Sequence, residues 1–122
     1  FRAVVEGIAA GTAHVLETYA EVGASPDRVL AVGGGTKNPL WLQATSDFGG
    51  VPQHVCEKTI GASYGDAFLA ALAIGAARPE DILTWNPNAS TVTPETVPAY
   101  ATQYPLWKRL YAQTKDLMRA LP

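Results

Sequence analysis

Three consecutive glycines, Gly33, Gly34 and Gly35, follow a short apolar run and precede a segment with helical character. Residues without a Cβ let the backbone turn sharply and let a ligand approach the main chain closely. A helix that begins after such a loop directs unpaired N–H groups and the positive end of its dipole toward the loop, which favours an anionic phosphate. The alternative is an ordinary strand-to-helix turn that binds nothing.

The elements around the glycines follow from the apolar pattern. Apolar residues at helical spacing predict a first helix over residues 1–22, ended by Gly23 and its neighbours. Residues 28–32 predict a strand, whose uniformly apolar character favours burial in a parallel sheet. A helix is expected after the glycine loop, ending at Gly49-Gly50. Residues 51–57 then predict a second strand.

A third helix is predicted over residues 63–75. Ser63 and Asp66 stand at the spacing of a capping box at its start. Because the segment is apolar on almost every side, we expect it to be buried on several sides. Residues 76–98 contain four prolines and predict a loop, with at most a short extended piece at 91–93.

Aromatic residues follow one face of the helix predicted at the end of the chain: Tyr100, Tyr104, Trp107 and Tyr111. Their spacing favours packing against the first helix over a ligand platform. Pro105 either kinks this helix or marks its start. The order of elements predicts an α/β fold in which helices flank a short parallel sheet. Two strands are too few for an independent sheet, so further strands are expected upstream or from another copy.

Composition limits the classes of partner. The chain has 122 residues, of which 48% are hydrophobic and 16% charged, so a globular domain is expected with part of its surface covered by more protein. A net charge of −2 argues against nucleic acid or an anionic membrane as partner. The single cysteine, Cys56, excludes an internal disulfide and favours a reducing, cytoplasmic environment. The longest apolar run, 67–77, is too short to span a bilayer, and the start at Phe1 without a leader suggests a fragment.

Two motifs in the chain resemble one known family. Residues 32–43, with Ser46-Asp47 beyond them, resemble the C-terminal signature region of the FGGY family of carbohydrate kinases. Glu57 and residues 60–71 resemble the same family's Glu followed by a Gly-Ala-Ala-like helix start. The resemblance covers essentially the whole chain. It implies that residues 1–122, without an internal boundary, are the C-terminal portion of the family's second domain, half of an actin-like ATPase (ribonuclease H-like) domain.

The resemblance also implies a function. The family transfers the γ-phosphoryl group of ATP, with Mg²⁺, to a sugar or polyol hydroxyl, and a pentulose such as xylulose is the leading choice here. By the family pattern Gly34 and Gly35 lie against the phosphates and ribose, while Thr36 and Asn38 border the adenine. Asn38 is the best candidate for a side-chain hydrogen bond to the base. The family's catalytic aspartate and most ligands of the metal and sugar are expected upstream, so this chain alone is expected to be inactive.

Other polar residues have simpler interpretations. His54 and Cys56 alternate onto one face of the second strand, and too few ligands converge on them to predict a metal site. Glu57 is expected to act as a cap or in an ion pair, and Asp47 to be solvated or ion-paired. His14 lies near the apolar stripe of the first helix and is expected to be a partly buried structural residue.

Two other function classes stay open at this point. One is a non-catalytic parallel α/β binding module whose glycine loop matches by chance, and the other is a pseudokinase remnant. For the chain alone we expect a homo-oligomer, a symmetric dimer, because a two-stranded sheet and an apolar helix would leave an edge and a broad apolar face exposed to water.

Overall fold

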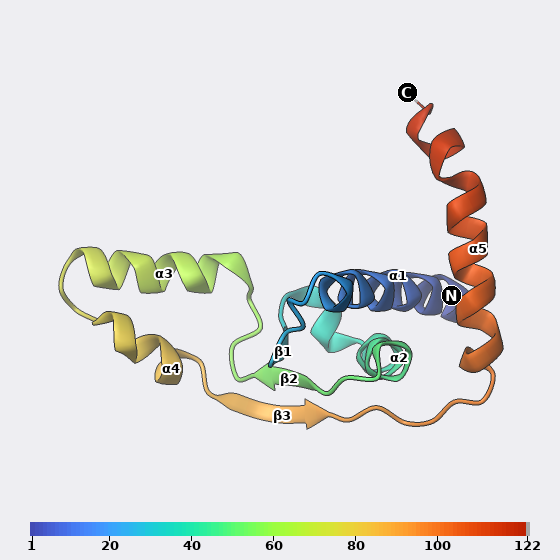
Figure 1. Cartoon of the computed structure of the whole chain (residues 1–122). Coiled ribbons are helices and arrows are strands. Elements are labelled where there is room, and N and C mark those ends of the chain that lie inside the picture. The colour runs from blue at the N-terminus through green and yellow to red at the C-terminus, as the bar shows by residue number, and fades with distance from the viewer. Residues whose placement is uncertain (122) are drawn as a thin grey trace.

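The computed structural model describes residues 1–121 and confirms an α/β fold, in which helices flank a short sheet (Figure 1). Helices α1 and α2 cover one side of the sheet, the α3–α4 pair extends beyond one end of it, and α5 rises at the other end. The elements are α1 Arg2–Glu21, β1 Val29–Ala31, the 3₁₀ turn η1 Gly34–Lys37, α2 Pro39–Gly49, β2 Gln53–Cys56, α3 Ala62–Ala73, the 3₁₀ turn η2 Pro79–Asp81, α4 Ile82–Trp85, β3 Asn88–Val92 and α5 Tyr100–Arg119.

The sheet has the order β1-β2-β3 and is mixed. β1 pairs with β2 in parallel, with Leu30 opposite His54, whereas β3 runs antiparallel to β2. The sequence analysis missed β3, because it treated the proline-rich segment as loop with one short extended piece. It also expected a buried first strand, yet Leu30 is 42% exposed. β1 has no second neighbour among the described strands, so it forms an edge of the sheet.

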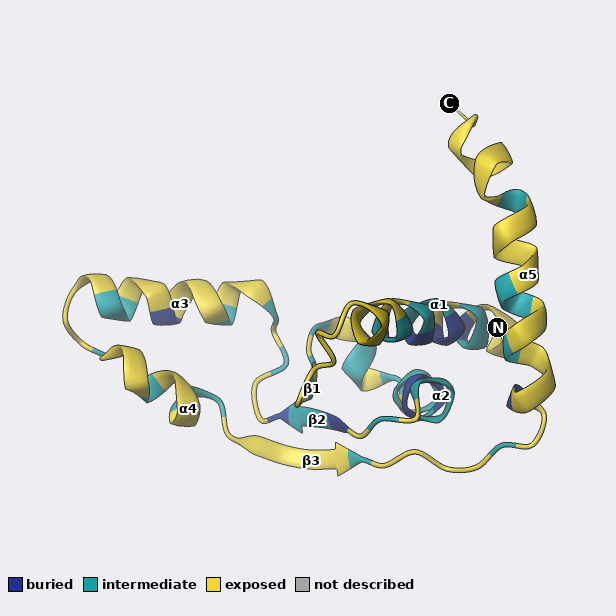
Figure 2. Ribbon diagram, in the orientation of Figure 1, coloured by how far each residue is buried: buried dark blue, intermediate teal, exposed yellow. Residues whose placement is uncertain are grey.

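The core lies where α1 packs on α2 (Figure 2). Small residues at helical spacing on α1 let the two helices approach closely, and the buried residues are Val5, Ala9, Ala10, Ala13 and, from α2, Ala44, Thr45 and Ser46. The left-handed Gly50 (φ 62°) ends α2, as the paired glycines predicted.

A buried polar network joins α2 to two strands. Gln53 of β2 is 5% exposed, and its Nε2 donates to the carbonyl oxygen of Leu42 at 2.7 Å and to Ser46 Oγ at 2.9 Å. Ser46 Oγ in turn donates to the carbonyl oxygen of Val92 in β3 at 3.1 Å. Because buried polar groups cost free energy unless they are paired, these bonds hold α2 at one position over the sheet.

Helix α3 is exposed, contrary to the expectation of burial on several sides. Phe68 is its one buried residue, packed on Trp85 of α4 with ring centroids 5.0 Å apart, whereas Leu69 is 62% exposed. Apolar composition indicates that a helix favours apolar neighbours. Among the described elements, α4 is the one that supplies such neighbours to α3. The predicted capping box at Ser63 is also wrong, because the helix starts one residue earlier, after Gly61, and has no side-chain cap.

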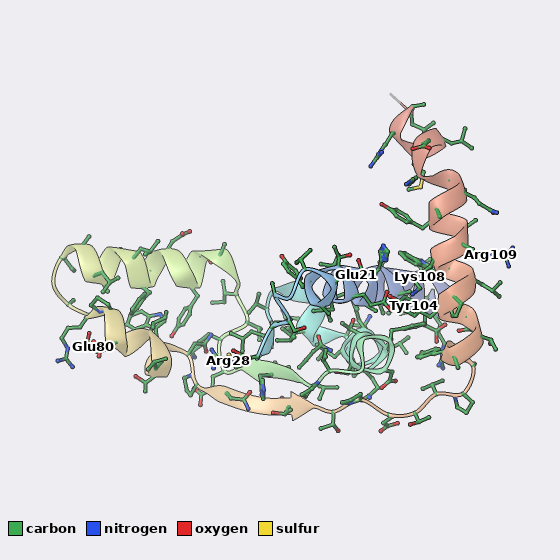
Figure 3. The ribbon with its side chains drawn as sticks, viewed as in Figure 1. Glu21, Arg28, Glu80, Tyr104, Lys108 and Arg109 are labelled. Atoms are coloured by element: carbon green, nitrogen blue, oxygen red, sulfur yellow. The ribbon has the colours of Figure 1, made fainter. Side chains whose placement is uncertain are left out.

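Helix α5 packs its aromatic face on α1, as predicted. Trp107 lies against Gly11 and near His14, and Lys108 Nζ binds Glu17 Oε2 at 3.2 Å. Figure 3 shows Tyr104 and Lys108 on the side of α5 that faces α1. Pro105 lies inside the helix, which begins at Tyr100, so it does not mark the start. Among residues 1–121, no helix is long and apolar enough to cross a membrane.

A carboxylate at this interface makes stability depend on pH. Arg2 Nε and the Tyr100 hydroxyl both donate to Glu6 Oε1, each at 2.8 Å, and the hydrogen bond from Arg2 is the main cause of a lowered pKa of Glu6. A lowered folded-state pKa contributes stability above the unfolded pKa of about 4.3, which is lost as pH falls through the folded value.

We therefore expect Glu6→Gln to lower the free energy of unfolding of this chain at pH 7. The difference from wild type should vanish on acidification below the pKa of Glu6, because the wild-type carboxylate is then also neutral. Urea unfolding at a series of pH values measures both. An equal difference at pH 7 and pH 3 would contradict the interpretation.

The exposed apolar surface leads to a second prediction. Ile60 and Ile74 are 69% and 81% exposed, and the outer edge of β1 is unpaired in the described chain. Such a surface favours association. We expect the 122-residue chain to form a symmetric dimer through α3 and the β1 edge. Light scattering over a concentration series tests this, and a monodisperse monomer at high concentration would contradict it.

Candidate functional site

The glycine loop and the start of α3 meet at one edge of the sheet. Because β1 and β2 are parallel, their carboxyl ends lie side by side, the position where open α/β sheets bind ligands. The Gly33 N–H donates to the Thr59 carbonyl oxygen at 2.8 Å, and a Cβ on Gly61 would lie 3.8 Å from Gly33 Cα. The two motifs that the sequence analysis treated separately therefore form one site.

The three glycines of the loop differ in their surroundings. Gly33 has φ 84°, a left-handed conformation that a side chain would strain, and it turns the chain out of β1. Gly34 is exposed, and a Cβ there would meet no atom within 4 Å. A Cβ on Gly35 would lie 3.3 Å from two ring carbons of Trp41, a close contact with a side chain of the chain itself.

The segment after Gly33 is a hydrogen-bonded 3₁₀ turn. The backbone N–H and hydroxyl of Thr36 both bind the Gly33 carbonyl oxygen, at 3.2 and 2.7 Å, and the Asn38 N–H donates to the Gly35 carbonyl oxygen at 3.0 Å. The threonine hydroxyl is therefore used to close the turn. The turn holds Gly34 at the outside of the loop, where its backbone faces solvent.

Asn38 caps α2. Its Oδ1 accepts hydrogen bonds from the N–H groups of Leu40 at 3.1 Å and Trp41 at 3.3 Å, and Pro39 occupies the first helical position. This corrects the expectation that α2 offers unpaired N–H groups to a phosphate, because the asparagine side chain already satisfies them. What remains available on Asn38 is its Nδ2 amide donor, which makes no hydrogen bond among the residues described.

The start of α3, unlike that of α2, has no side-chain cap. Its N-cap is Gly61, with φ 87°, and no side chain caps its first amides. The approach to it is held by Asn86, whose side chain accepts from the Lys58 N–H at 2.9 Å and donates to the Lys58 carbonyl oxygen at 2.7 Å. The sequence analysis overlooked Thr59 and Asn86. A lone asparagine in a proline-rich segment gave no signal, since the contact spans 28 residues.

The remaining polar candidates differ in their surroundings. Glu57 is exposed, and its side chain makes no ion pair or cap within residues 1–121, so that expectation is wrong. Asp47 is half-buried, and its Oδ1 accepts hydrogen bonds from Gln43 Nε2 and the Glu95 N–H, both at 2.7 Å. His54 Nδ1 lies 3.0 Å from Thr91 Oγ1.

His14 is half-buried, with its ring 5.9 Å from that of Trp107 and 5.5 Å from that of Tyr111, which agrees with a structural role. No group of three or more His, Cys, Asp or Glu side chains within the described part of the chain could hold a metal ion.

An open hollow of about 320 Å³ adjoins the loop. Its walls are mainly apolar and come from α1, β1, the glycine loop, α2 and β2. Near the loop they include Val32, Gly35, Thr36 and Trp41. A larger hollow of about 420 Å³ lies between the end of α2 and the start of α5, lined by Phe48 and Tyr100 among others, and is separate from the loop.

The geometry defines a class of protein: α/β proteins with a glycine-rich loop at the carboxyl edge of two parallel strands. Residues 1–74 match the model of the FGGY family of carbohydrate kinases, C-terminal domain. The chain therefore belongs to the FGGY family of carbohydrate kinases.

Similar proteins agree with the match. The chain is 34% identical to the xylulose kinase of Bacillus subtilis over 98% of its own length and 25% of that protein's. It is 32% identical to a ribulokinase of Mycolicibacterium smegmatis over 99% of its length and 23% of the relative's. The crystal structure of a xyloylose kinase from Brucella ovis superposes with a TM-score of 0.76 at 32% identity, over 93% of this chain and 25% of that one. The chain thus spans about a quarter of the length of these relatives.

Asn38 has two polar groups with different expected roles: Oδ1 caps α2, and Nδ2 is available to a ligand. We expect Asn38→Ala to lower the free energy of unfolding of the chain by about 1 kcal/mol, because the Leu40 and Trp41 amides lose their acceptor. Asn38→Asp keeps an acceptor oxygen at the same place, now as part of a carboxylate, and should be nearly neutral, although it removes the Nδ2 donor. Urea unfolding of both variants measures this, and equal destabilisation would show that Oδ1 does not cap the helix.

Proposed function

We propose that this chain is the nucleotide-binding part of an ATP-dependent sugar kinase, which transfers the γ-phosphoryl group of ATP to a hydroxyl of a pentulose such as xylulose. The observation that carries the proposal is the family match over residues 1–74, which include the whole glycine loop. The names of the relatives, xylulose kinase and ribulokinase, support a pentulose as acceptor.

The geometry of the loop supports a division of labour among its residues. Gly34 has open space beside its Cα, so a phosphate or ribose can approach its backbone. Asn38 has its Nδ2 donor available while Oδ1 caps α2, and the ring nitrogens of adenine accept hydrogen bonds. Thr36 borders the nucleotide through its backbone and methyl group, because its hydroxyl binds Gly33. Gly35 supports the turn, with one face against Trp41.

The reaction needs more than this chain contains. The sugar hydroxyl loses a proton as its oxygen bonds to the γ-phosphorus, and ADP leaves. In our proposal the aspartate that accepts the proton, and the ligands of Mg²⁺, lie in other parts of the complete protein, since no carboxylate cluster occurs within residues 1–121. The chain alone should therefore show no turnover and bind ATP weakly. We expect the complete protein to act in the cytoplasm.

The test uses the complete protein that contains this chain. We expect ADP release from MgATP that depends on one of the pentuloses when pentuloses, hexuloses, polyols and glycerol are compared. ATP binding without turnover on any acceptor would favour a pseudokinase. Absence of ATP binding would favour a non-catalytic α/β module and overturn the proposal.

A matched pair of glycine variants tests the loop itself. Gly34→Ala should raise the KM for ATP about tenfold without loss of stability, because its methyl group meets no protein atom within 4 Å but does meet the nucleotide. Gly7→Ala, also without a neighbour within 4 Å and placed on α1, is the control and should leave the KM unchanged. An unchanged KM for Gly34→Ala would remove Gly34 from the site.

A further inference from the structure

The indole ring of Trp41 lies directly against the glycine loop. A Cβ on Gly35 would approach Trp41 Cε3 and Cζ3 to 3.3 Å and Cδ2 to 3.7 Å, so it would press on the six-membered ring, which would have to give by a few tenths of an ångström. A Cβ on Gly33 or on Gly34 would meet no atom within 4 Å. Trp41 is therefore the side chain that supports this part of the loop.

The position of the ring follows from helix geometry. Trp41 is the third residue of α2, and helical side chains point back toward the N-terminus of their helix, which here leads to the loop. The Trp41 N–H is held by the side-chain and backbone oxygens of Asn38, at 3.3 and 3.1 Å. Asn38 thus fixes the backbone of the residue whose ring contacts Gly35.

The contact between Trp41 and Gly35 borders an open space into which the loop could otherwise move. Gly35, Thr36 and Trp41 together line the open hollow of about 320 Å³ beside β1. Without the ring, the loop would have room to move into this hollow, and the 3₁₀ turn would carry Gly34 with it. A small displacement of a binding group weakens the interactions that it makes with a ligand.

We propose that Trp41 is a positioning residue, which sets the place of the Gly34–Gly35 backbone against the nucleotide phosphates without touching the nucleotide. This inference rests on the proposed kinase function and adds to it the residue that controls affinity for ATP. A side chain at Gly35 would displace the indole ring by a few tenths of an ångström, whereas Gly34 is the position that the ligand approaches.

The experiment compares variants of the complete enzyme in steady-state kinetics. Trp41→Leu keeps an apolar residue in α2 but removes the ring, and it raises the KM for ATP about tenfold while the KM for the sugar stays unchanged. Trp41→Phe retains a six-membered ring and gives a KM between those of wild type and Trp41→Leu. Trp107→Leu, which removes an indole from the α1–α5 interface, is the control and leaves the KM for ATP unchanged.

A double-mutant cycle provides a readout that a general loss of stability would not change. Gly35→Ala alone pushes its methyl group against the ring and raises the KM for ATP, but in the Trp41→Leu background the same methyl group has space. The two changes are therefore non-additive, and the second substitution has a smaller effect than it has in wild type.

The outcomes separate this inference from the function on which it rests. A wild-type enzyme that neither binds nor uses ATP overturns the proposed function and, with it, the role of Trp41. A wild-type enzyme that uses ATP, with Trp41→Leu lowering kcat alone and the cycle additive, overturns the role of Trp41 and leaves the function in place. A raised KM for ATP with coupling to Gly35 supports both.

Discussion

The buried amide of Gln53 is the constraint on which the rest of the structure depends. A polar group at that depth must be hydrogen-bonded, and its two donor contacts, to the Leu42 carbonyl oxygen and to Ser46 Oγ, are both on α2. Ser46 extends the connection to Val92 in β3. One short network thus sets the position of α2 relative to β2 and β3, and the loop at the start of α2 inherits that position.

The glycine loop shows why residues of one type need not share one role. Gly33 is favoured by its left-handed backbone conformation, and a Cβ on Gly35 would press on the ring of Trp41, whereas Gly34 has neither a positive φ nor a neighbour within 4 Å. A pattern of three glycines is compatible with close approach of a ligand at all three positions. Backbone conformation accounts for Gly33 and packing against Trp41 for Gly35, so Gly34 is the glycine for which the chain itself supplies no reason.

The two ends of the sheet differ in how completely the described residues bury their apolar surface. α1, α2 and α5 cover one another through small and aromatic side chains, with Phe48 stacked on Tyr100 at a centroid distance of 3.8 Å. α3 has similar apolar content but contacts α4 mainly through Phe68. Its exposed side chains are those of a helix that favours further protein around it, consistent with relatives about four times as long.

The sequence by itself determined the α/β class, α1, α2, both parallel strands and the family, because these depend on local periodicity and on motifs that are contiguous in the chain. The tertiary structure alone decided which groups meet. The pairing of Gly33 with Thr59, the use of Asn38 as a cap and the antiparallel β3 all depend on backbone hydrogen bonds or on contacts between distant residues. Burial of β1 and α3 was misjudged for the same physical reason: apolar composition states what a segment favours, whereas exposure depends on which elements lie beside it.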